Sequence, residues 1–347
     1  MAKPEYPPKP RPGDRVAVVS PSAGLPELFP LPFELGLRRL EAGFGLIPVE
    51  YPTTRKMGSS PAERAADLHA AFADDSVKAV ISSIGGDDQI TVLPHLDAEL
   101  LRADPKPFFG FSDCTNLLAY LHRLGVVGFH GGAVMTAFGR PGAMHPLTAE
   151  SLRAALFTSG EYALRPAETF GDVDRDWADP ATFDSEPATL PGEGWRWHGP
   201  DRVAEGRSWG GCVEVVAWLL MADATIPPLP EFDGAVLFLD TSEELPSDAE
   251  VYRILRSMGE RGILGRCGAL LMGRAKGWCF DKPNTDAQRR EYTSAQREAV
   301  LRAMEEYAPD AVVVLDVDLG HTEPQLVIPY GGCVRVDGSA RTITVRY

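Results

Sequence analysis

The sequence predicts an α/β protein with two domains and a mostly parallel sheet. Short apolar runs typical of buried strands alternate with segments whose apolar residues recur at helical spacing. The chain has 347 residues, which is longer than one compact core usually supports, so we expect two domains. Binding sites of such folds collect beyond the carboxyl ends of the parallel strands.

Residues 1–163 are expected to form the first domain. Strands are predicted at 16–20, 46–51, 79–83 and 108–111, with helices at 33–44 and 60–77 between them. Ser60 followed by a proline is typical of a capped first helical turn. Two of these strands end in unusual residues, because the third leads into Gly85 and Gly86 and the fourth ends at Ser112.

Residues 164–205 differ from both flanking regions. They are rich in Pro, Asp, Gly and Trp and show no periodicity, so we expect a connection between domains that also lies over the site. Residues 206–347 are expected to form a smaller α/β domain. It would contain a helix from Cys212, strands at "GAVLFLD", "GALLMG" and "AVVVLDV", a helix at "TSAQREAVLRAMEEY" and a final hairpin that turns near Asp337 and Gly338.

Composition and charge exclude several classes of protein. The net charge of -15 argues against a nucleic-acid partner, because phosphate binding requires a basic surface. No apolar run is long enough to span a membrane, and prolines occupy the position where a signal peptide needs apolar residues. We therefore expect a cytoplasmic protein without a membrane partner.

The sequence contains no pattern that indicates a metal or a cofactor. The five cysteines are odd in number and scattered, which indicates free thiols in a reducing compartment. No C-x-x-C or H-E-x-x-H motif occurs. A nucleotide-binding module is disfavoured because the chain has no phosphate-loop motif and no G-x-G-x-x-G after its first strand.

Three residues suited to acyl transfer each follow an apolar strand-like run. They are Ser112, Asp240 and His321. Acyl transfer needs a nucleophile, a base that takes its proton, and a carboxylate that fixes the tautomer of the base. The local motif "GFSDC" is incomplete, since Cys114 replaces the second glycine of a G-x-S-x-G turn. Ser112 alone could equally be a helix cap, and Cys114 is a rival nucleophile, although a buried thiol is the expected role of that cysteine.

The glycine pair could support the serine. Gly85 and Gly86 allow backbone N–H groups to approach a substrate carbonyl, and the N–H of Asp113 lies directly after the nucleophile. Such donors form an oxyanion hole, in which one donor lowers the barrier by roughly 2.7 to 4 kcal/mol. The start of the helix after Ser112 adds a positive dipole end.

Several motifs resemble those of the LD-carboxypeptidase family of serine peptidases (peptidase family S66). They are "SSIGGDD", "GFSDCTNLLAYL", "RSWGGCVEVVAWLL", "AVLFLDTSEELPSDAEVYRILRSMGERG" and "DLGHTEPQLVIPYGG", in this order over nearly the whole chain. The connection and the "GRAKGW" segment look more like the branch of microcin C immunity proteins. The resemblance implies a flavodoxin-like N-terminal domain, a smaller C-terminal domain and a homodimer.

The resemblance also implies roles for individual residues. Ser112 would be the nucleophile, His321 the general base and acid, and Gly86 with Asp113 the oxyanion donors. The family usually has Glu where this chain has Asp240, so the carboxylate is one methylene shorter. Glu243 or Glu244 could take its place, but we expect Asp240 to orient His321.

Substrate-binding residues are expected around the glycine pair and the connection. Trp195, Trp197 and Trp209 either stack on a nucleobase, as the microcin-immunity branch implies, or pack between the domains. Gly85, Arg207, Glu214 and Arg274 are further candidates, and either arginine could bind a substrate carboxylate.

These observations predict a metal-independent serine carboxypeptidase that cleaves an amide through an acyl-enzyme. The favoured substrate is a peptidyl or aminoacyl nucleotide of the microcin C type. One alternative is a muropeptide that loses a terminal D-alanine during cell-wall recycling. Another is a binding protein of the same fold that has lost turnover because Asp240 is too short.

Overall fold

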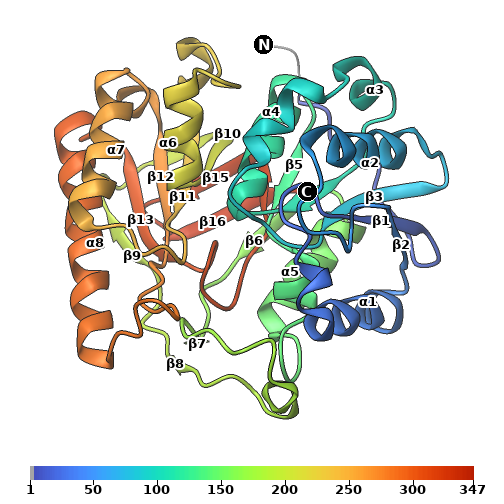
Figure 1. The fold of residues 1–347 in the computed structure, drawn as a ribbon. Coiled ribbons are helices and arrows are strands. Elements are labelled where there is room, and N and C mark those ends of the chain that lie inside the picture. The colour runs from blue at the N-terminus through green and yellow to red at the C-terminus, as the bar shows by residue number, and fades with distance from the viewer. Residues whose placement is uncertain (1–3) are drawn as a thin grey trace.

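The first sheet of the computed structural model, which describes residues 4–347, has the strand order expected for a flavodoxin-like domain (Figure 1). Its parallel strands run in the order β2-β1-β3-β4-β5, and β14 pairs antiparallel with β5 at one edge. The bounds are β1 Arg15–Val19, β2 Ile47–Glu50, β3 Val77–Ser82, β4 Phe108–Gly110, β5 Gly128–His130 and β14 Ile328–Tyr330. The predicted strands at 16–20, 46–51, 79–83 and 108–111 thus correspond to β1 to β4.

Helices follow most of these strands and bury their apolar faces against the sheet. They are α1 Pro30–Phe44, α2 Pro61–Ala73, α3 Ala98–Ala103, α4 Thr115–Arg123 and α5 Pro146–Phe157. Ser60 caps α2 as predicted, since its hydroxyl accepts from Glu63 N while the Glu63 carboxylate accepts from Ser60 N. Strand residues such as Val16 and Phe108 are fully buried.

The second sheet combines a parallel centre with antiparallel edges. Its order is β6-β16-β15-β10-β11-β12-β13-β9, of which β10 to β13 are parallel. The bounds are β6 Glu161–Leu164, β9 Arg196–His198, β10 Val203–Cys212, β11 Val236–Asp240, β12 Ala269–Gly273, β13 Val312–Val317, β15 Cys333–Asp337 and β16 Thr342–Arg346. Helices α6 Val213–Ala222, α7 Asp248–Glu260 and α8 Asp286–Tyr307 cover it. Strands β15 and β16 form the predicted terminal hairpin.

The connection contributes to the second sheet as well as linking the domains. Strand β9 of this region pairs with β13. Strand β6, which ends at the first residue of the region, pairs with β16 and so also belongs to the second sheet. Between them, β7 Thr169–Phe170 and β8 Leu190–Pro191 form a two-stranded ribbon at the bottom of the view in Figure 1. The boundaries at 163/164 and 205/206 therefore stay predictions.

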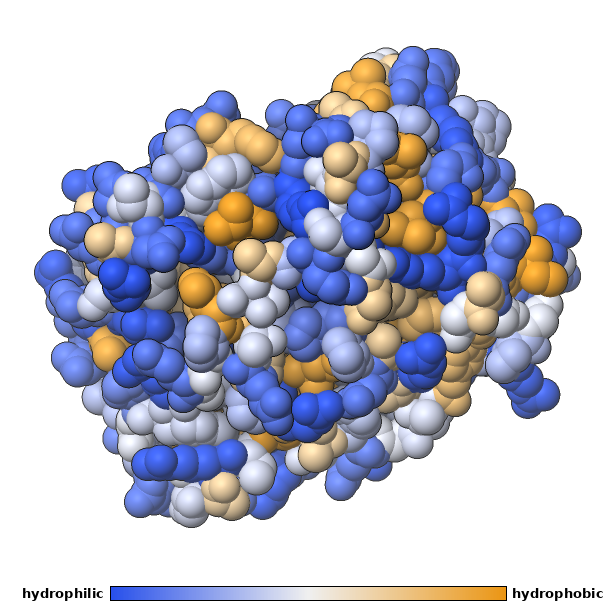
Figure 2. Space-filling model, turned by 90° about the horizontal axis from the view of Figure 1, so that it is seen from below, coloured by the Kyte–Doolittle hydropathy of each residue, from blue (hydrophilic) through white to orange (hydrophobic). Residues whose placement is uncertain are grey.

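The face that carries this ribbon is largely hydrophilic. Figure 2 views the molecule from that side and shows hydrophobic residues scattered among polar ones. Exposed apolar side chains of the connection and the nearby loops include Val173, Leu190 and Phe280. Across the described part of the chain, no helix is both long and apolar enough to cross a membrane.

Candidate active site

The turn between β4 and α4 holds Ser112 in an uncommon backbone conformation. Its φ of +58° lies in the left-handed region, which costs a non-glycine residue on the order of 1 kcal/mol or more. Residues 112–114 form a short helical turn that continues into α4. Cys114 is fully buried, and burial together with the neighbouring Asp113 raises the pKa of its thiol to about 12. The rival nucleophile is therefore a protonated, inaccessible thiol.

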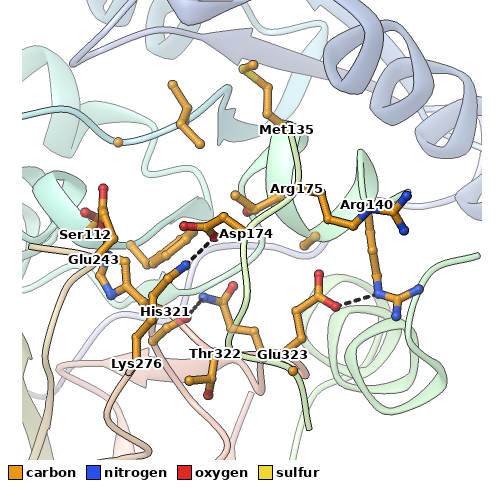
Figure 3. A pocket seen from close by; sticks show the side chains of 18 of the residues that line it. Ser112, Met135, Arg140, Asp174, Arg175, Glu243, Lys276, His321, Thr322 and Glu323 are labelled. Carbon is orange, nitrogen blue, oxygen red and sulfur yellow. Dashed lines mark hydrogen bonds and ion pairs between the residues drawn. The ribbon is translucent and has the colours of Figure 1, made fainter. Parts of the chain in front are cut away.

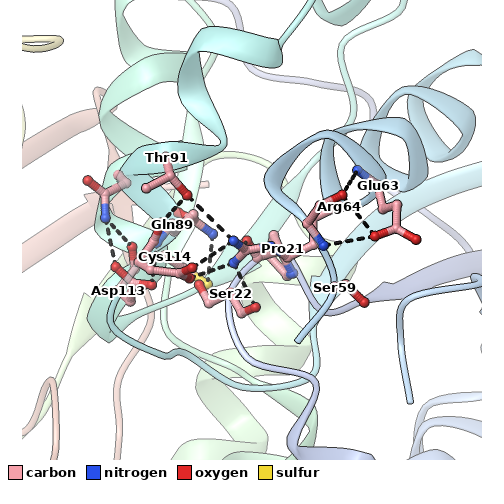
Figure 4. A network of polar contacts seen from close by, with 12 residues as sticks. Pro21, Ser22, Ser59, Glu63, Arg64, Gln89, Thr91, Asp113 and Cys114 are labelled. Atoms are coloured by element: carbon pink, nitrogen blue, oxygen red, sulfur yellow. Dashed lines mark hydrogen bonds and ion pairs between the residues drawn. The ribbon is translucent and has the colours of Figure 1, made fainter. Parts of the chain in front are cut away.

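A polar network beneath this turn ties it to the loop after β3 (Figure 4). Asp113 Oδ2 accepts from Gln89 N at 2.9 Å, and Asp113 Oδ1 accepts from Asn116 Nδ2 at 2.8 Å. Arg64 donates to Asp88 Oδ1 at 2.6 Å and to the carbonyl of Ser22 at 2.9 Å. Burial raises the pKa of Asp113 to about 6, although the hydrogen bond from Gln89 opposes the shift. The network fixes the glycine loop relative to the serine.

Gly85 lies directly against the serine side chain. A Cβ placed on Gly85 would be 3.0 Å from Ser112 Cβ, 3.2 Å from Ser112 Oγ and 3.4 Å from Asp113 N. A side chain at this position would therefore press on Ser112 and cover the backbone N–H of Asp113.

Asp240 and His321 meet at the carboxyl ends of two strands of the second sheet. Asp240 ends β11 and is completely buried, and its Oδ2 lies 2.6 Å from His321 Nδ1. Gly320 has a φ of +84°, and a Cβ there would be 2.3 Å from the Asp240 carboxylate, so only glycine fits before His321. The imidazole also packs edge-on against Phe111, the residue before Ser112, at a centroid distance of 5.1 Å.

Three carboxylates determine the protonation of His321. Burial alone would lower its pKa, but Asp240, followed by Glu243 and Glu214, raises the pKa of His321 to about 9. Glu243 Oε2 lies 3.3 Å from His321 Nε2, the ring nitrogen opposite Asp240. Burial raises the pKa of Glu243, but the charges of His321 and Lys276 outweigh this effect and lower it. Nε2 has no hydrogen-bond partner among residues 4–347.

Ser112 and His321 line one cavity of about 590 Å³ between the two sheets and the connection. Figure 3 shows Ser112, Glu243 and His321 on one side of the view and Arg140 on the other. Besides these, the wall includes Gly85, Gly86, Asp87, Phe111, Asp174, Arg175, Trp177, Glu244, Lys276, Phe280, Thr322 and Glu323. Parts of the connection thus lie over the site, and a volume of this size accommodates a ligand larger than a single amino acid.

Family models match both halves of the chain. The model described as the LD-carboxypeptidase N-terminal domain matches residues 16–131, and that of the LD-carboxypeptidase C-terminal domain matches residues 205–336. The chain belongs to the LD-carboxypeptidase family. The sequence-based expectation of a serine-type carboxypeptidase is thereby confirmed.

The relatives of this LD-carboxypeptidase include a self-immunity protein and a murein peptidase. The microcin C7 self-immunity protein MccF of Escherichia coli is 26% identical over 288 residues, which cover 82% of this chain and 78% of MccF. A murein tetrapeptide carboxypeptidase of Pseudomonas aeruginosa is 31% identical over 147 residues, covering 39% and 43% of the two chains. The crystal structure of an MccF-like protein from Streptococcus pneumoniae in complex with AMP superposes with a TM-score of 0.84 at 26% identity, covering 96% of this chain and 99% of that chain.

The structure brings together the reactive residues predicted from sequence. Gly85, Gly86, Ser112 and His321 line the cavity of the LD-carboxypeptidase, and Asp240 lies behind the histidine. Asp240 contacts Nδ1, whereas Glu243 lies at Nε2 and Glu244 contributes to the cavity wall.

Of the predicted substrate-binding residues, Gly85 lines this cavity, whereas the three tryptophans, Arg207, Glu214 and Arg274 are not part of its lining. Trp195 donates through Nε1 to Asp318 Oδ2 at 2.8 Å, Trp197 lies in β9, and Trp209 is buried edge-on against Phe232. These are packing contacts within the connection and the second sheet.

The polar candidates also have structural contacts elsewhere. Arg207 lies in β10 opposite Cys333, and Arg274 is buried against Asp318 and the Phe170 ring. Buried Glu214 accepts from the N and Oγ of Ser242 at 3.0 and 2.7 Å, so it positions the loop that carries Glu243.

Several residues of the cavity wall were not predicted from the sequence. Trp177, Arg175 and Phe280 lie in irregular segments, where no periodicity indicates the direction of a side chain.

His130 was also missed, although it ends β5 at the same sheet edge as Ser112. Its Nε2 lies 3.6 Å from Asp240 Oδ1, and complete burial lowers the pKa of His130 to about 4, so its imidazole is neutral. An apolar run followed by His, as in "GFHGG", was the available signal.

Proposed function

We propose that this protein hydrolyses an amide bond near a carboxyl terminus through an acyl-enzyme on Ser112. The observation that carries the proposal is one cavity that contains a serine at positive φ and a histidine whose Nδ1 is 2.6 Å from a buried aspartate. This is the residue set that activated-serine catalysis requires.

The steps follow from the positions of these groups. His321 Nε2 accepts the hydroxyl proton as Ser112 Oγ attacks the carbonyl, and the N–H groups of Gly86 and Asp113 stabilise the oxyanion. The C–N bond breaks as the amine takes the proton from His321. Water then attacks the ester by the same route, which releases the carboxylic acid and returns the proton to Ser112.

Asp240 serves as the orienting carboxylate in this proposal. Its contact with Nδ1 supports it over Glu243 and Glu244, because the base must keep Nε2 directed at the nucleophile. The Nε2 of neutral His130 lies 3.6 Å from the other carboxylate oxygen of Asp240, so His130 packs beside this shorter side chain.

A peptidyl or aminoacyl nucleotide is the proposed substrate. Support comes from the similarity to the microcin C7 self-immunity protein and to an AMP complex, together with aromatic residues in the cavity wall. Trp177 and Phe280 replace Trp195, Trp197 and Trp209 as candidates for stacking on a base. Arg175 donates to Ser185 and to no carboxylate among the described residues, so it is the candidate for an anionic part of the substrate.

A muropeptide is the second candidate substrate, and it rests on the murein tetrapeptide carboxypeptidase relative. Mass-spectrometric turnover of wild-type and Ser112→Ala protein on both compounds distinguishes the two. Ser112-dependent release of the amino acid from an aminoacyl sulfamoyl adenosine supports the nucleotide, whereas release of D-alanine from an L,D-tetrapeptide supports cell-wall recycling. The absence of Ser112-dependent turnover on both would contradict the proposal and favour the binding-protein alternative. The expected homodimer and the cytoplasmic location stay predictions.

Substitution of Gly85 by alanine tests the oxyanion site. We expect kcat to fall about 10- to 100-fold with a smaller change in KM, because the new Cβ would press on Ser112 Cβ and displace the reacting atoms. Gly43→Ala is the matched control, since a Cβ on Gly43 meets nothing within 4 Å. A Gly85→Ala enzyme with normal kcat would contradict the assignment of this loop.

The pH dependence of kcat/KM tests the environment of His321. The base must be neutral, so activity rises as pH increases through its pKa, which the carboxylates place near 9 and above the usual value of about 6.5. Glu243→Gln removes one of these charges, so the midpoint of the acid limb should move to lower pH, whatever the plateau rate. Glu305→Gln, exposed on α8, should leave the midpoint in place. An unchanged midpoint in Glu243→Gln would show that Glu243 does not act on the base.

A further inference from the structure

The cavity wall is strongly acidic next to the proposed nucleophile. Asp87 follows the glycine pair that contacts Ser112, and Glu243 and Glu244 follow the strand that ends at Asp240. Within residues 4–347, Asp87 and Glu244 form no ion pair, and His321 is the one basic side chain within 4 Å of the Glu243 carboxylate. Burial, followed by the charges of Glu214, Glu243, Glu250 and Asp87, raises the pKa of Glu244.

Arg140 and Lys276 of the wall form ion pairs with other carboxylates, although the charge of Lys276 also acts on Glu243. Arg140 donates to Glu323 Oε2 at 2.7 Å and to Glu186 Oε2 at 2.5 Å. Lys276 pairs with Asp174, and Lys282, outside the wall, donates to the carbonyls of Glu244 and Leu245. Arg175 bonds Ser185, and its side chain extends away from Ser112 in Figure 3. Negative charge is thus concentrated at the end of the cavity that contains Ser112.

His321 provides a second observation that is independent of the acidic residues. Its side chain is 7% exposed, it lines the cavity, and Nε2 has no hydrogen-bond partner in the described chain. This nitrogen must be neutral to act as a base. Among the described residues, no other basic side chain lies within 4 Å of the Glu243 carboxylate, and Lys276, whose charge also acts on Glu243, is paired with Asp174. A reacting group can therefore satisfy Nε2, and a positive group of the same ligand can pair with Glu243 beside it.

We propose that the substrates carry an ammonium or guanidinium group beside the scissile amide, where Glu243, Glu244 and Asp87 bind it. This inference rests on the proposed function and specifies its substrate class. The cation can be the α-ammonium of the acyl residue or its basic side chain, since both offer the same N–H donors to carboxylates. An anionic part of the same substrate would extend toward Arg175.

The bound cation also assists the base. The groups facing His321 are Asp240 from β11, His130 from β5, Glu214 from α6 and Glu243 from the loop after β11. A substrate cation at Glu243 offsets one of the charges that favour imidazolium and repels the imidazolium itself. The acid limb of kcat, which reports the enzyme–substrate complex, should therefore lie at lower pH than the acid limb of kcat/KM.

Charge-varied aminoacyl compounds test this proposal. Lysyl, norleucyl and glutamyl sulfamoyl adenosine, each with a free and an acetylated α-amino group, are compared by kcat/KM at low and high salt. We expect the lysyl compound to exceed the glutamyl compound by about 10-fold or more, and the difference to shrink in high salt. It should also shrink in Glu243→Gln/Glu244→Gln and persist in Glu305→Gln. A large fall in kcat/KM when the norleucyl compound is acetylated identifies the α-ammonium as the bound cation. If acetylation has little effect and the lysyl compound still exceeds the norleucyl compound, the bound cation is the side chain.

The outcomes separate this inference from the proposed function. Ser112-dependent turnover with equal rates for all charges, or with a preference for the glutamyl compound, overturns the inference and leaves the function standing. If no compound turns over, the function fails for this substrate class, and calorimetric affinities of Ser112→Ala protein for the lysyl and glutamyl compounds still decide the charge preference. If the double variant does not fold, Glu244→Gln alone and the salt dependence of the wild-type enzyme provide the same decision.

Discussion

Ser112→Ala is expected to abolish turnover, with kcat reduced by about 10⁴-fold or more. The hydroxyl is the only group lost, because alanine keeps the Cβ and the same left-handed backbone. A fluorophosphonate probe should label the wild-type protein at residue 112 and leave the variant unlabelled. The measurement is turnover of the preferred substrate together with intact-mass analysis after labelling.

The stability of the variant is the control for this experiment. Ser112→Ala should melt near the wild-type temperature, because the polar network below the turn uses Asp113 rather than the serine hydroxyl. Residual turnover within 10-fold of wild type would exclude Ser112 as the nucleophile. Labelling at Cys114 would have the same meaning, although its buried thiol makes that result unexpected.

Asp240→Asn is expected to lower kcat by roughly 10³- to 10⁴-fold while KM changes little. The amide cannot favour the tautomer that places the proton on Nδ1, and it removes the charge that stabilises the imidazolium beside it. The same loss of charge should shift the acid limb of the pH profile downward, which a purely structural role would not do. Steady-state kinetics between pH 5 and about pH 10 provide both readouts.

Asp201→Asn is the matched control, since Asp201 is exposed and lies at the start of β10 away from the cavity. Turnover of Asp240→Asn at the wild-type rate would show that another group orients His321. Glu243 would be the first residue to test in that case, because it already contacts the other nitrogen of the ring.

The parallel strands could be predicted because their sequences are continuous apolar runs of adequate length. Buried runs such as "VAVV" and "VLFLD" have one stable environment, the centre of a sheet covered on both faces. Strand β14 could not be predicted in the same way. It contains Pro329, which a sheet tolerates at an edge, and its partner β5 lies about 200 residues earlier in the chain. The strands β6 and β9 are short and form only through pairing with distant partners.

The same distinction explains what could be predicted of the site. Parallel strands direct their carboxyl ends to one edge of their sheet, so local sequence indicates that Asp240, at the end of β11, and His321, after β13, lie at the same edge. Ser112 follows β4 of the first sheet, and its approach to them depends on how the two sheets face each other. Trp177, Arg175 and Phe280 belong to irregular segments whose path depends on tertiary contacts, such as the edge-on packing of Trp177 against Phe29. The tryptophans with the more regular spacing, Trp195 and Trp197, lie in or next to a strand and pack there.

The pairing of β14 with β5 has a consequence for biosynthesis. The sheet that holds the proposed nucleophile receives its edge strand from residues 328–330, which leave the ribosome after the proposed base, His321. A nascent chain therefore lacks both the completed sheet and the proposed base until residue 330 has been translated. Translation products that stop before this strand are expected to be inert fragments rather than unregulated hydrolases.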